Sequence, residues 1–219
     1  IIEAIESSKD ISRVYLLKSN AHKSSLFKSL VSLLENNNIK YSFVPKEKFK
    51  KFENKNHQGA VAILSPIKLL SIEELISVTF NKISSKTYVL LDGITDARNF
   101  GAIIRTAVAS NVDGIIIPQN NSAPVNSDVI KTSSGGVFKI PIARVNNIKD
   151  AILHLDSLEI NIISLSEKAN KTIYEYNFKE STAIIMGSEE KGISKGVLSL
   201  SSEILKIPID SKIDSLNVS

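Results

Sequence analysis

The feature that most constrains the fold is a series of short apolar runs from residue 87 onward. Each run has the length of a β-strand, and helical or turn-rich stretches separate the runs, which are TYVLLDG (87–93), GIIIP (114–118), VFKIPI (137–142), INIISL (160–165), TAIIMG (182–187) and EILKIPI (203–209). Strands that are buried on both faces are almost continuously apolar, and their alternation with helices is typical of a parallel sheet. The sequence therefore predicts an α/β fold whose mostly parallel sheet carries helices on both faces.

A smaller α/β unit precedes this series. We expect strands at RVYLLK (13–18), IKYSFV (39–44) and GAVAIL (59–64), an amphipathic helix near 22–36, and a lysine-rich helix or turn near 46–54. Pro66 then interrupts the pattern, and residues 71–83 have the sequence of a helix that Ser71 and Glu74 cap. These patterns predict a small domain at 1–66, a linker at 67–86 and a larger domain at 87–219.

The composition excludes several kinds of site. The chain has no cysteine, which excludes disulfides, thiolate metal sites and cysteine nucleophiles. His22, His57 and His154 lie far apart and form no HExxH pattern, so we predict no metal site and no histidine-based triad. SSGG at 133–136 lacks the GxxxxGK[ST] pattern of a phosphate loop, so we interpret it as a turn. Because no apolar run reaches the roughly 18 residues of a membrane span and no signal-peptide pattern is present, we expect a cytoplasmic protein without a membrane partner.

Positive charge is concentrated in the first part of the chain. Residues 1–85 carry 13 Lys and Arg against 8 Asp and Glu, whereas residues 86–219 carry 14 against 15. In PKEKFKKFENK (45–55), five lysines are interleaved with Phe49 and Phe52. Lysines attract phosphates and aromatic rings stack on bases, so this segment is either an RNA-docking surface or the solvated face of a helix. The residues alone leave both interpretations open.

The segments that follow three of the predicted strands hold most of the polar candidates. Ligands of parallel sheets bind beyond the carboxyl ends of the strands, and the segments there are NFGAIIRTA (99–107), IIMGSEEKGIS (184–194) and IPIDSKIDSLNVS (207–219). In the first segment, Gly101 permits a close backbone approach on a helix that begins near Arg98. The second predicts a short loop between Gly187 and Gly192, and the third offers Ser215 as a helix N-cap.

In this order, the three segments resemble motifs 1, 2 and 3 of the SpoU (TrmH-like) family of RNA ribose 2′-O-methyltransferases, part of the SPOUT superfamily. The resemblance implies that the second and third loops form a deep trefoil knot, which holds the cofactor S-adenosylmethionine in a bent shape. It implies a homodimer without a metal ion, whose small N-terminal domain is similar to ribosomal protein L30e and binds the RNA substrate. The family continues beyond SLNVS with a C-terminal helix, which we expect to be missing from this sequence.

The resemblance also assigns site residues. The positions that match the polar active site are Asn99, Arg105, Glu189, Ser215 and Asn217, and those that match the methyl-donor contacts are Gly187, Ile207 and Leu216. Arg105 is expected to assist the ribose 2′-hydroxyl, either by holding the adjacent phosphate or by helping to remove the proton. A guanidinium is protonated at ordinary pH, which argues against the second role. Asn99 is expected to orient Arg105 or the ribose, and Glu189 to organise the second loop. Ser215 and Asn217 are expected to fix the third loop against the first.

HQGAVAI at 57–63 is typical of the RlmB-like subgroup, which methylates a guanosine of 23S ribosomal RNA. His57 and Gln58 are thus candidates for RNA contacts, although Gln58 and Gly59 can equally serve to shape the turn into the following strand. The resemblance therefore implies an S-adenosylmethionine-dependent 2′-O-methyltransferase acting on 23S rRNA. A tRNA 2′-O-methyltransferase and a catalytically inactive RNA-binding assembly factor of the same fold are the alternatives.

Overall fold

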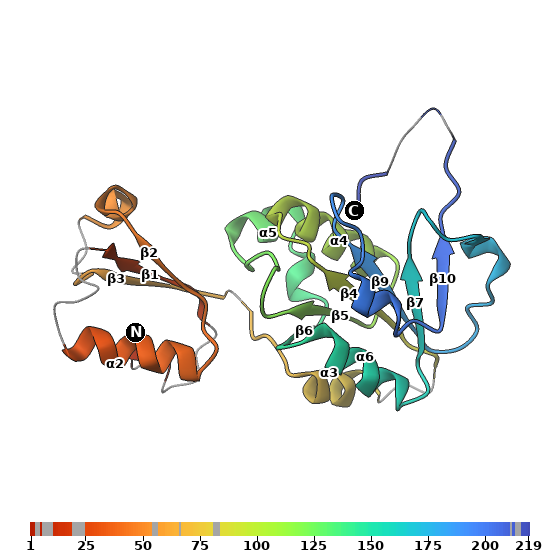
Figure 1. Cartoon of the computed structure of the whole chain (residues 1–219), viewed down its shortest axis with the longest axis horizontal. Helices are drawn as coiled ribbons and strands as arrows, with labels where there is room; N and C mark the ends of the chain where they lie inside the picture. Colours follow the sequence, from red (N-terminus) through yellow and green to blue (C-terminus); the bar gives the residue numbers. More distant parts are fainter. Residues whose placement is uncertain are drawn as a thin grey trace. The chain divides into compact units, whose positions relative to one another are not determined.

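The computed structural model describes residues 1–2, 5, 11–18, 25–53, 57–65, 67–80, 84–210, 212 and 216–219 of the chain. They form two compact units, Ile1–Lys68 and Leu69–Ser219 (Figure 1). None of the helices in these ranges has the length and the apolar character that crossing a membrane requires.

The first unit is built on a mixed sheet that has three strands among the described residues, in the order β2-β1-β3. The central strand β1 (Ile11–Leu17) pairs in parallel with β2 (Tyr41–Val44) and antiparallel with β3 (Ala60–Leu64). Val14 and Leu16 of β1 are fully buried, because α2 (Ser25–Asn36) packs against their face of the sheet through Phe27, Leu30 and Leu34. The three strands expected in this part of the chain are present.

The lysine-rich segment forms a 3-10 helix, η2 (Lys46–Phe52), on the side of the sheet opposite α2 (Figure 1). Phe49 is buried, and its ring centroid lies 4.8 Å from that of His57, which links η2 to the turn before β3. His57 Nδ1 accepts a hydrogen bond from the Gly59 N–H at 2.9 Å. Gln58 has a left-handed backbone, with φ of 49°, and an exposed side chain. His57 therefore shapes the turn into β3, while Gln58 faces solvent.

The second unit contains a parallel sheet that has seven strands within the described ranges, in the order β6-β5-β4-β9-β7-β10-β8. All of its paired strands run parallel. In chain order they are β4 (Thr87–Asp92), β5 (Gly114–Pro118), β6 (Ile142–Val145), β7 (Asn161–Leu165), β8 (Lys171–Thr172), β9 (Thr182–Gly187) and β10 (Glu203–Lys206). This architecture confirms the predicted α/β fold, and β5 and β9 match the predicted runs to the residue.

Helices cover both faces of this sheet. They are α3 (Ile72–Thr79), α4 (Ala97–Ala109), α5 (Ser127–Thr132), η3 (Gly136–Phe138), α6 (Ile148–Asp156), η4 (Ile173–Glu175) and α7 (Lys195–Leu198). Figure 1 shows α4 and α5 on one face and α3 and α6 on the other. A large core lies under α3 and α6, where Leu75, Tyr88, Leu90, Ile116 and Ile152 are fully buried.

The segment expected to be a linker contains α3, which packs on the second unit. Leu70 forms a parallel bridge with Ala143 of β6, and Leu75 is fully buried. The hydroxyl oxygens of Thr79 and Tyr88 lie 2.6 Å apart, so a hydrogen bond also joins α3 to β4. The helix is therefore part of the second unit.

The capping box expected at the start of α3 is present. Ser71 Oγ accepts a hydrogen bond from the Glu74 N–H at 3.2 Å, and Glu74 Oε2 accepts one from the Ser71 N–H at 2.9 Å. Ser71→Ala is expected to lower the free energy of unfolding by about 1 kcal/mol, because one helix N–H loses its acceptor. Urea denaturation measures this change against Ser77→Ala, an exposed position inside the same helix. Equal stabilities of the two variants would contradict a stabilising role for the cap.

The region of the predicted run VFKIPI differs from the expectation. Val137 and Phe138 belong to η3, and the strand of this region is β6, which begins at Ile142. The cause is the preceding turn, in which Gly135 has a left-handed backbone with φ of 76°. The chain then packs Val137 into the core as part of a helical turn. The interpretation of SSGG as a turn agrees with the structure over residues 133–135.

The far edge of the sheet is formed by β10 and the short strand β8. β10 ends at Lys206, earlier than the run EILKIPI predicts, because the chain then reaches a proline that lacks the N–H of a further ladder bond.

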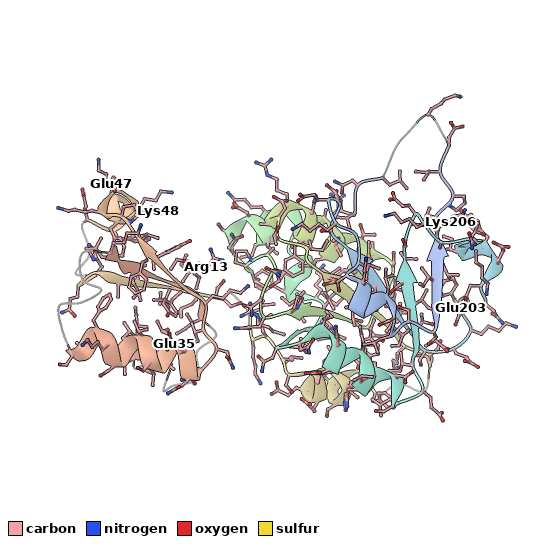
Figure 2. The ribbon with its side chains drawn as sticks, in the orientation of Figure 1. Arg13, Glu35, Glu47, Lys48, Glu203 and Lys206 are labelled. Carbon is pink, nitrogen blue, oxygen red and sulfur yellow. The ribbon has the colours of Figure 1, made fainter. Side chains whose placement is uncertain are left out.

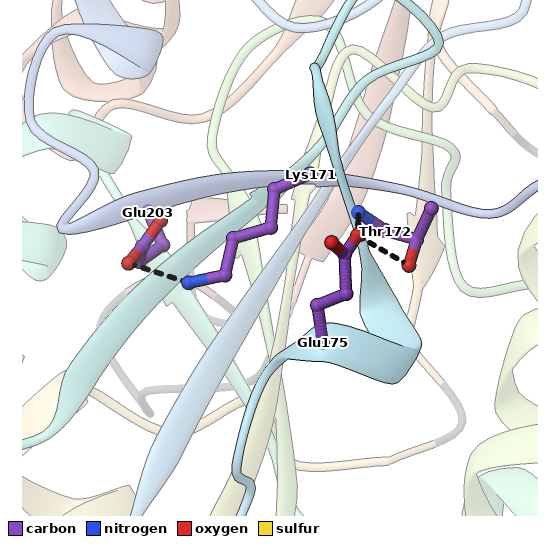
Figure 3. Close-up of polar contacts among 4 residues, drawn as sticks. All are labelled: Lys171, Thr172, Glu175 and Glu203. Carbon is purple, nitrogen blue, oxygen red and sulfur yellow. Dashed lines mark hydrogen bonds and ion pairs between the residues drawn. The ribbon is translucent and has the colours of Figure 1, made fainter.

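Lys171 Nζ of β8 contacts Glu203 Oε1 of β10 at 3.0 Å (Figure 3). Hydrogen bonds from the backbone N–H and the hydroxyl of Thr172 hold the pKa of the Glu175 carboxyl below its usual value.

Candidate active site

The first motif lies in α4, which follows β4 after a short loop. Asp96 caps the helix, because its Oδ1 accepts hydrogen bonds from the Arg98 N–H at 2.8 Å and the Asn99 N–H at 2.9 Å. This cap fixes Asn99 in the first turn, where it is half-buried. A Cβ added at Gly101 would lie 2.6 Å from that of Thr132, so the close approach expected at this glycine is between α4 and α5.

The second motif forms a tight loop at the end of β9. Ser188 and Gly192 pair as an antiparallel bridge, in which the Gly192 N–H donates to the Ser188 carbonyl at 2.8 Å. Beyond the loop, the Ser194 N–H donates to Asp92 Oδ2 at 2.8 Å, which ties this segment to the end of β4. The loop therefore stands beside the first motif, with Glu189 in its exposed turn.

Side chains from all three motifs meet in one hydrogen-bonded group, the motif cluster of Asn99, Glu189 and Asn217. Asn99 Nδ2 donates to Glu189 Oε1 at 3.4 Å, and Asn217 Nδ2 donates to Asn99 Oδ1 at 3.4 Å. Glu189 Oε1 also accepts from the Val218 N–H at 3.1 Å. Asn99 is 90 residues from Glu189 and 118 residues from Asn217 in the sequence, so only the tertiary fold brings them together.

The other two polar candidates are not part of this cluster. Arg105 is exposed on α4, and its side chain makes no hydrogen bond or ion pair with the residues that the structure describes. Ser215 lies outside the described residues. An exposed guanidinium on the helix that carries Asn99 can bind a phosphate without breaking a described contact of the folded chain.

The residues assigned to the methyl donor follow strands of the same sheet. Gly187 ends β9, and Ile207 directly follows β10. Leu216 directly precedes Asn217, the member of the motif cluster that comes from the third segment. The side chains of Ile207 and Leu216 are 45% and 53% exposed. These side chains offer apolar surface next to the main-chain polar groups of loops, a combination that suits a nucleoside. The residues present therefore fit S-adenosylmethionine. Among the described residues, no group of His, Asp and Glu side chains is arranged to hold a metal ion.

Two aspartates of this site carry no assignment from the sequence. Asp96 has a local signal, because it directly precedes a helical pattern, as an N-cap does. The contact of Asp92 with Ser194 spans 102 residues, and no local pattern encodes it.

Comparison with protein families identifies the chain. Residues 86–219 match the model of the SpoU rRNA Methylase family. The chain belongs to this family. Residues 1–70 of this SpoU protein match a second model, described as RNA 2′-O ribose methyltransferase substrate binding. The two models thus cover most of both compact units.

Individual relatives are similar to this SpoU protein over most of its length. An uncharacterized tRNA/rRNA methyltransferase of Mycoplasma pneumoniae is 35% identical over 222 residues, which cover 100% of this chain and 88% of that protein. The 23S rRNA (guanosine-2′-O-)-methyltransferase RlmB of Vibrio vulnificus is 35% identical over 164 residues, 75% of this chain and 66% of that protein. The crystal structure of the SpoU methyltransferase AviRb from Streptomyces viridochromogenes with AdoMet has the same fold. Its TM-score is 0.63 at 18% identity, and the match covers 98% of this chain and 80% of that chain.

Family membership confirms the enzyme class that the sequence indicates. This SpoU protein is an RNA 2′-O-ribose methyltransferase, and its methyl donor is S-adenosylmethionine. RNA is therefore its substrate.

Proposed function

We propose that this SpoU methyltransferase modifies the ribose 2′-hydroxyl of a guanosine in 23S rRNA. The observation that carries the proposal is the contact among Asn99, Glu189 and Asn217, which joins the three motifs. The similarity to RlmB supports the choice of substrate, as does HQGAVAI at 57–63, which is typical of the RlmB-like subgroup.

The reaction depends on alignment. Bound S-adenosylmethionine supplies a methyl group on sulfur, and transfer forms a bond between that carbon and the ribose 2′-oxygen as the carbon–sulfur bond breaks. The 2′-hydroxyl is a poor nucleophile near neutral pH, so the enzyme must hold it in line with the methyl group and allow its proton to leave. The task of the protein side chains is therefore to fix the ribose and its phosphate.

Arg105 is the residue that we assign to the phosphate next to the target ribose. A guanidinium presents five N–H donors in a planar fork that matches two phosphate oxygens. It stays protonated, so binding a phosphate suits Arg105 better than accepting a proton. Its exposure on α4 leaves the side chain accessible to RNA.

The motif cluster holds the three loops against one another. Glu189 accepts hydrogen bonds from Asn99 and from the Val218 N–H, so it organises the second loop between the first and the third. Asn217 binds Asn99 from the third loop, where we also assign a structural role to Ser215. In our proposal, Asn99 then orients the ribose or Arg105.

We assign Gly187, Ile207 and Leu216 to the methyl donor, and we propose that the second and third loops form the trefoil knot of the SPOUT fold. The hydrogen bond between Val218 and Glu189 supports this, because the end of the third segment returns to the second loop.

In this proposal, residues 1–66 form the RNA-binding domain and residues 87–219 form the methyltransferase domain. The lysines of η2 are exposed, and they are Lys46, Lys48, Lys50 and Lys51. Figure 2 shows Lys48 and Glu47 on η2, on the side of the small sheet away from Glu35 of α2. Clustered exposed lysines favour contact with phosphates. The exposed Gln58 is a further candidate for an RNA contact.

Two other functions remain as alternatives. The name of the relative from Mycoplasma pneumoniae includes both tRNA and rRNA, so a tRNA substrate is the rival within the enzyme class. A binding protein without turnover is the rival outside it. The presence of Arg105 together with the whole motif cluster argues against that function, because RNA binding alone does not need these four residues.

We also propose that the enzyme is a cytoplasmic homodimer, as its resemblance to the family implies. Light scattering of the purified protein measures the mass of the particle. A monomeric mass for an active enzyme would contradict the proposed dimer.

Transfer of labelled methyl from S-adenosylmethionine to unmodified 23S rRNA, 16S rRNA and tRNA tests the proposed function. We expect label on 23S rRNA, mapped to the 2′-oxygen of one guanosine. Label on tRNA alone would favour the rival substrate. No label on any RNA, with both donor and RNA bound, would favour the binding protein.

A further inference from the structure

A basic stretch of the second unit is not used by the proposed mechanism. Residues 86–219 contain 14 Lys and Arg against 15 Asp and Glu. Between Asp128 and Asp150, however, there are four basic residues, Lys131, Lys139, Arg144 and Lys149, and no acidic residue. This stretch includes α5 from Val129 onward, which contains Lys131, the SSGG turn, and η3, which Lys139 directly follows, whereas Arg144 lies in β6 and Lys149 in α6. It therefore gives a nearly neutral unit one locally positive segment.

The α5 and η3 parts of this stretch lie directly against the helix that carries Arg105. A Cβ added at Gly136 would lie 3.5 Å from Ile104 Cγ2 and 3.8 Å from the Arg105 Cα. On the preceding turns, α5 approaches α4 at Gly101. Packing against α4 at these points fixes η3 beside the turn of α4 from which the Arg105 side chain projects.

The side chain of Phe138 is 59% exposed at this place. Val137, one residue earlier, is 1% exposed, so η3 buries one apolar side chain and leaves the aromatic ring in solvent. Lys139, Lys131 and Ser134 are exposed on the same turns. We name Lys131, Ser134, Phe138 and Lys139 the α5–η3 patch.

The backbone of the SSGG turn does not supply an anion site. Its N–H groups are used within the turn: Ser134 donates to the Lys131 carbonyl at 3.0 Å, and Gly136 donates to the Ser133 carbonyl at 2.9 Å. Any phosphate at this place must therefore be held by side chains, of which the patch offers Lys131 and Lys139.

We infer that the α5–η3 patch binds the nucleotide next to the methylated one, with its base stacked on Phe138 and its phosphates near Lys131 and Lys139. The two exposed lysines of the patch outnumber the one carboxylate of α5, Asp128, and favour a polyanion as the occupant. An exposed aromatic ring combined with exposed cations on neighbouring turns is an arrangement that binds unstacked bases. The inference rests on the proposed function, since the patch adjoins Arg105, which we assign to the phosphate of the target ribose.

The test compares Phe138→Ala, Phe138→Tyr and Phe138→Leu in the full chain. Stacking predicts that Phe138→Ala raises the KM for unmodified 23S rRNA about 10-fold, with kcat and donor affinity within about 2-fold of wild type. Phe138→Tyr keeps the ring and should behave as wild type, whereas Phe138→Leu keeps only apolar bulk and should behave as Phe138→Ala. The matched control is Phe178→Ala, since Phe178 is 44% exposed and follows β8 at the opposite edge of the sheet from β6.

Ultraviolet cross-linking of the wild-type protein to 23S rRNA that contains 4-thiouridine gives a readout that needs no turnover. We expect a cross-linked peptide that includes Phe138 and is lost in Phe138→Ala. Its presence supports the patch even if no RNA is methylated, so failure of the proposed function can be told apart from failure of the inference. Its absence overturns the inference.

Two further results would also overturn it. Activity of Phe138→Leu equal to that of Phe138→Tyr would show that bulk matters and stacking does not. A change of particle mass in Phe138→Ala, measured by light scattering, would show that the ring contacts a second copy of the chain and not RNA.

Discussion

Arg105→Ala is expected to reduce methyl transfer by about 10³-fold while leaving the affinity for S-adenosylmethionine nearly intact. The loss is large because the guanidinium is assigned to the phosphate of the target ribose. When the reacting hydroxyl is misplaced, most of the rate enhancement that comes from aligning a bound substrate is lost. The donor should be unaffected, because Arg105 makes no described contact with the loops at Gly187, Ile207 or Leu216. Single-turnover methyl transfer and calorimetric titration of the donor measure the two quantities.

Two further variants sharpen this result. Arg105→Lys keeps the charge but loses the planar fork, so it should recover only part of the activity. Lys179→Ala removes an exposed cation that precedes β9, at the amino end of that strand, and should leave methyl transfer unchanged. Equal losses of donor binding and methyl transfer in Arg105→Ala would rule out the assigned role, because they would mean that the residue supports the donor site itself.

The parallel sheet could be predicted from the sequence because its strands are buried on both faces. β5 and β9 each consist of one apolar run with a clear end, and both match the prediction. The run at 137–142 failed for a tertiary reason, since the left-handed turn at Gly135 directs Val137 into the core as part of η3. The segment at 67–86 contains a helix with a visible cap, but the sequence carries no signal for the contact between Thr79 and Tyr88 that joins this helix to β4.

The candidate site could be predicted only as three separate segments. Its residues were found by resemblance to a family, and the contacts among Asn99, Glu189 and Asn217 were not readable from any local pattern, because they span 90 residues or more. Asp92 was missed for the same reason. Phe138 lies in a run that was expected to be a strand, so the sequence did not predict that its side chain is exposed.

Gly187→Ala is the second substitution with a large expected effect, and it tests the geometry of the second loop. A Cβ at Gly187 would overlap the backbone carbonyl group of Gly192 and the backbone nitrogen of Ile193. Neither neighbour is a flexible side chain, so the loop must open and the hydrogen bond between Gly192 and Ser188 must break. We expect the free energy of unfolding to fall by about 2–3 kcal/mol. The donor binds to the native form of the loop, so the free energy needed to restore that form weakens donor binding. We therefore expect donor affinity to fall about 30-fold or more.

Gly192→Ala is the matched control, because it adds the same methyl group to the other end of the same loop. Gly192 has φ of 65°, and a Cβ there would meet nothing within 4 Å. Its only cost is the left-handed backbone, about 1 kcal/mol. Thermal unfolding and calorimetric titration of the donor should therefore rank the variants as wild type, Gly192→Ala and Gly187→Ala, with the larger step between the last two. Equal effects would mean that the loop tolerates a side chain at Gly187. They would also mean that the tight packing of the loop, which is followed by the hydrogen bond to Asp92, does not stabilise the donor site.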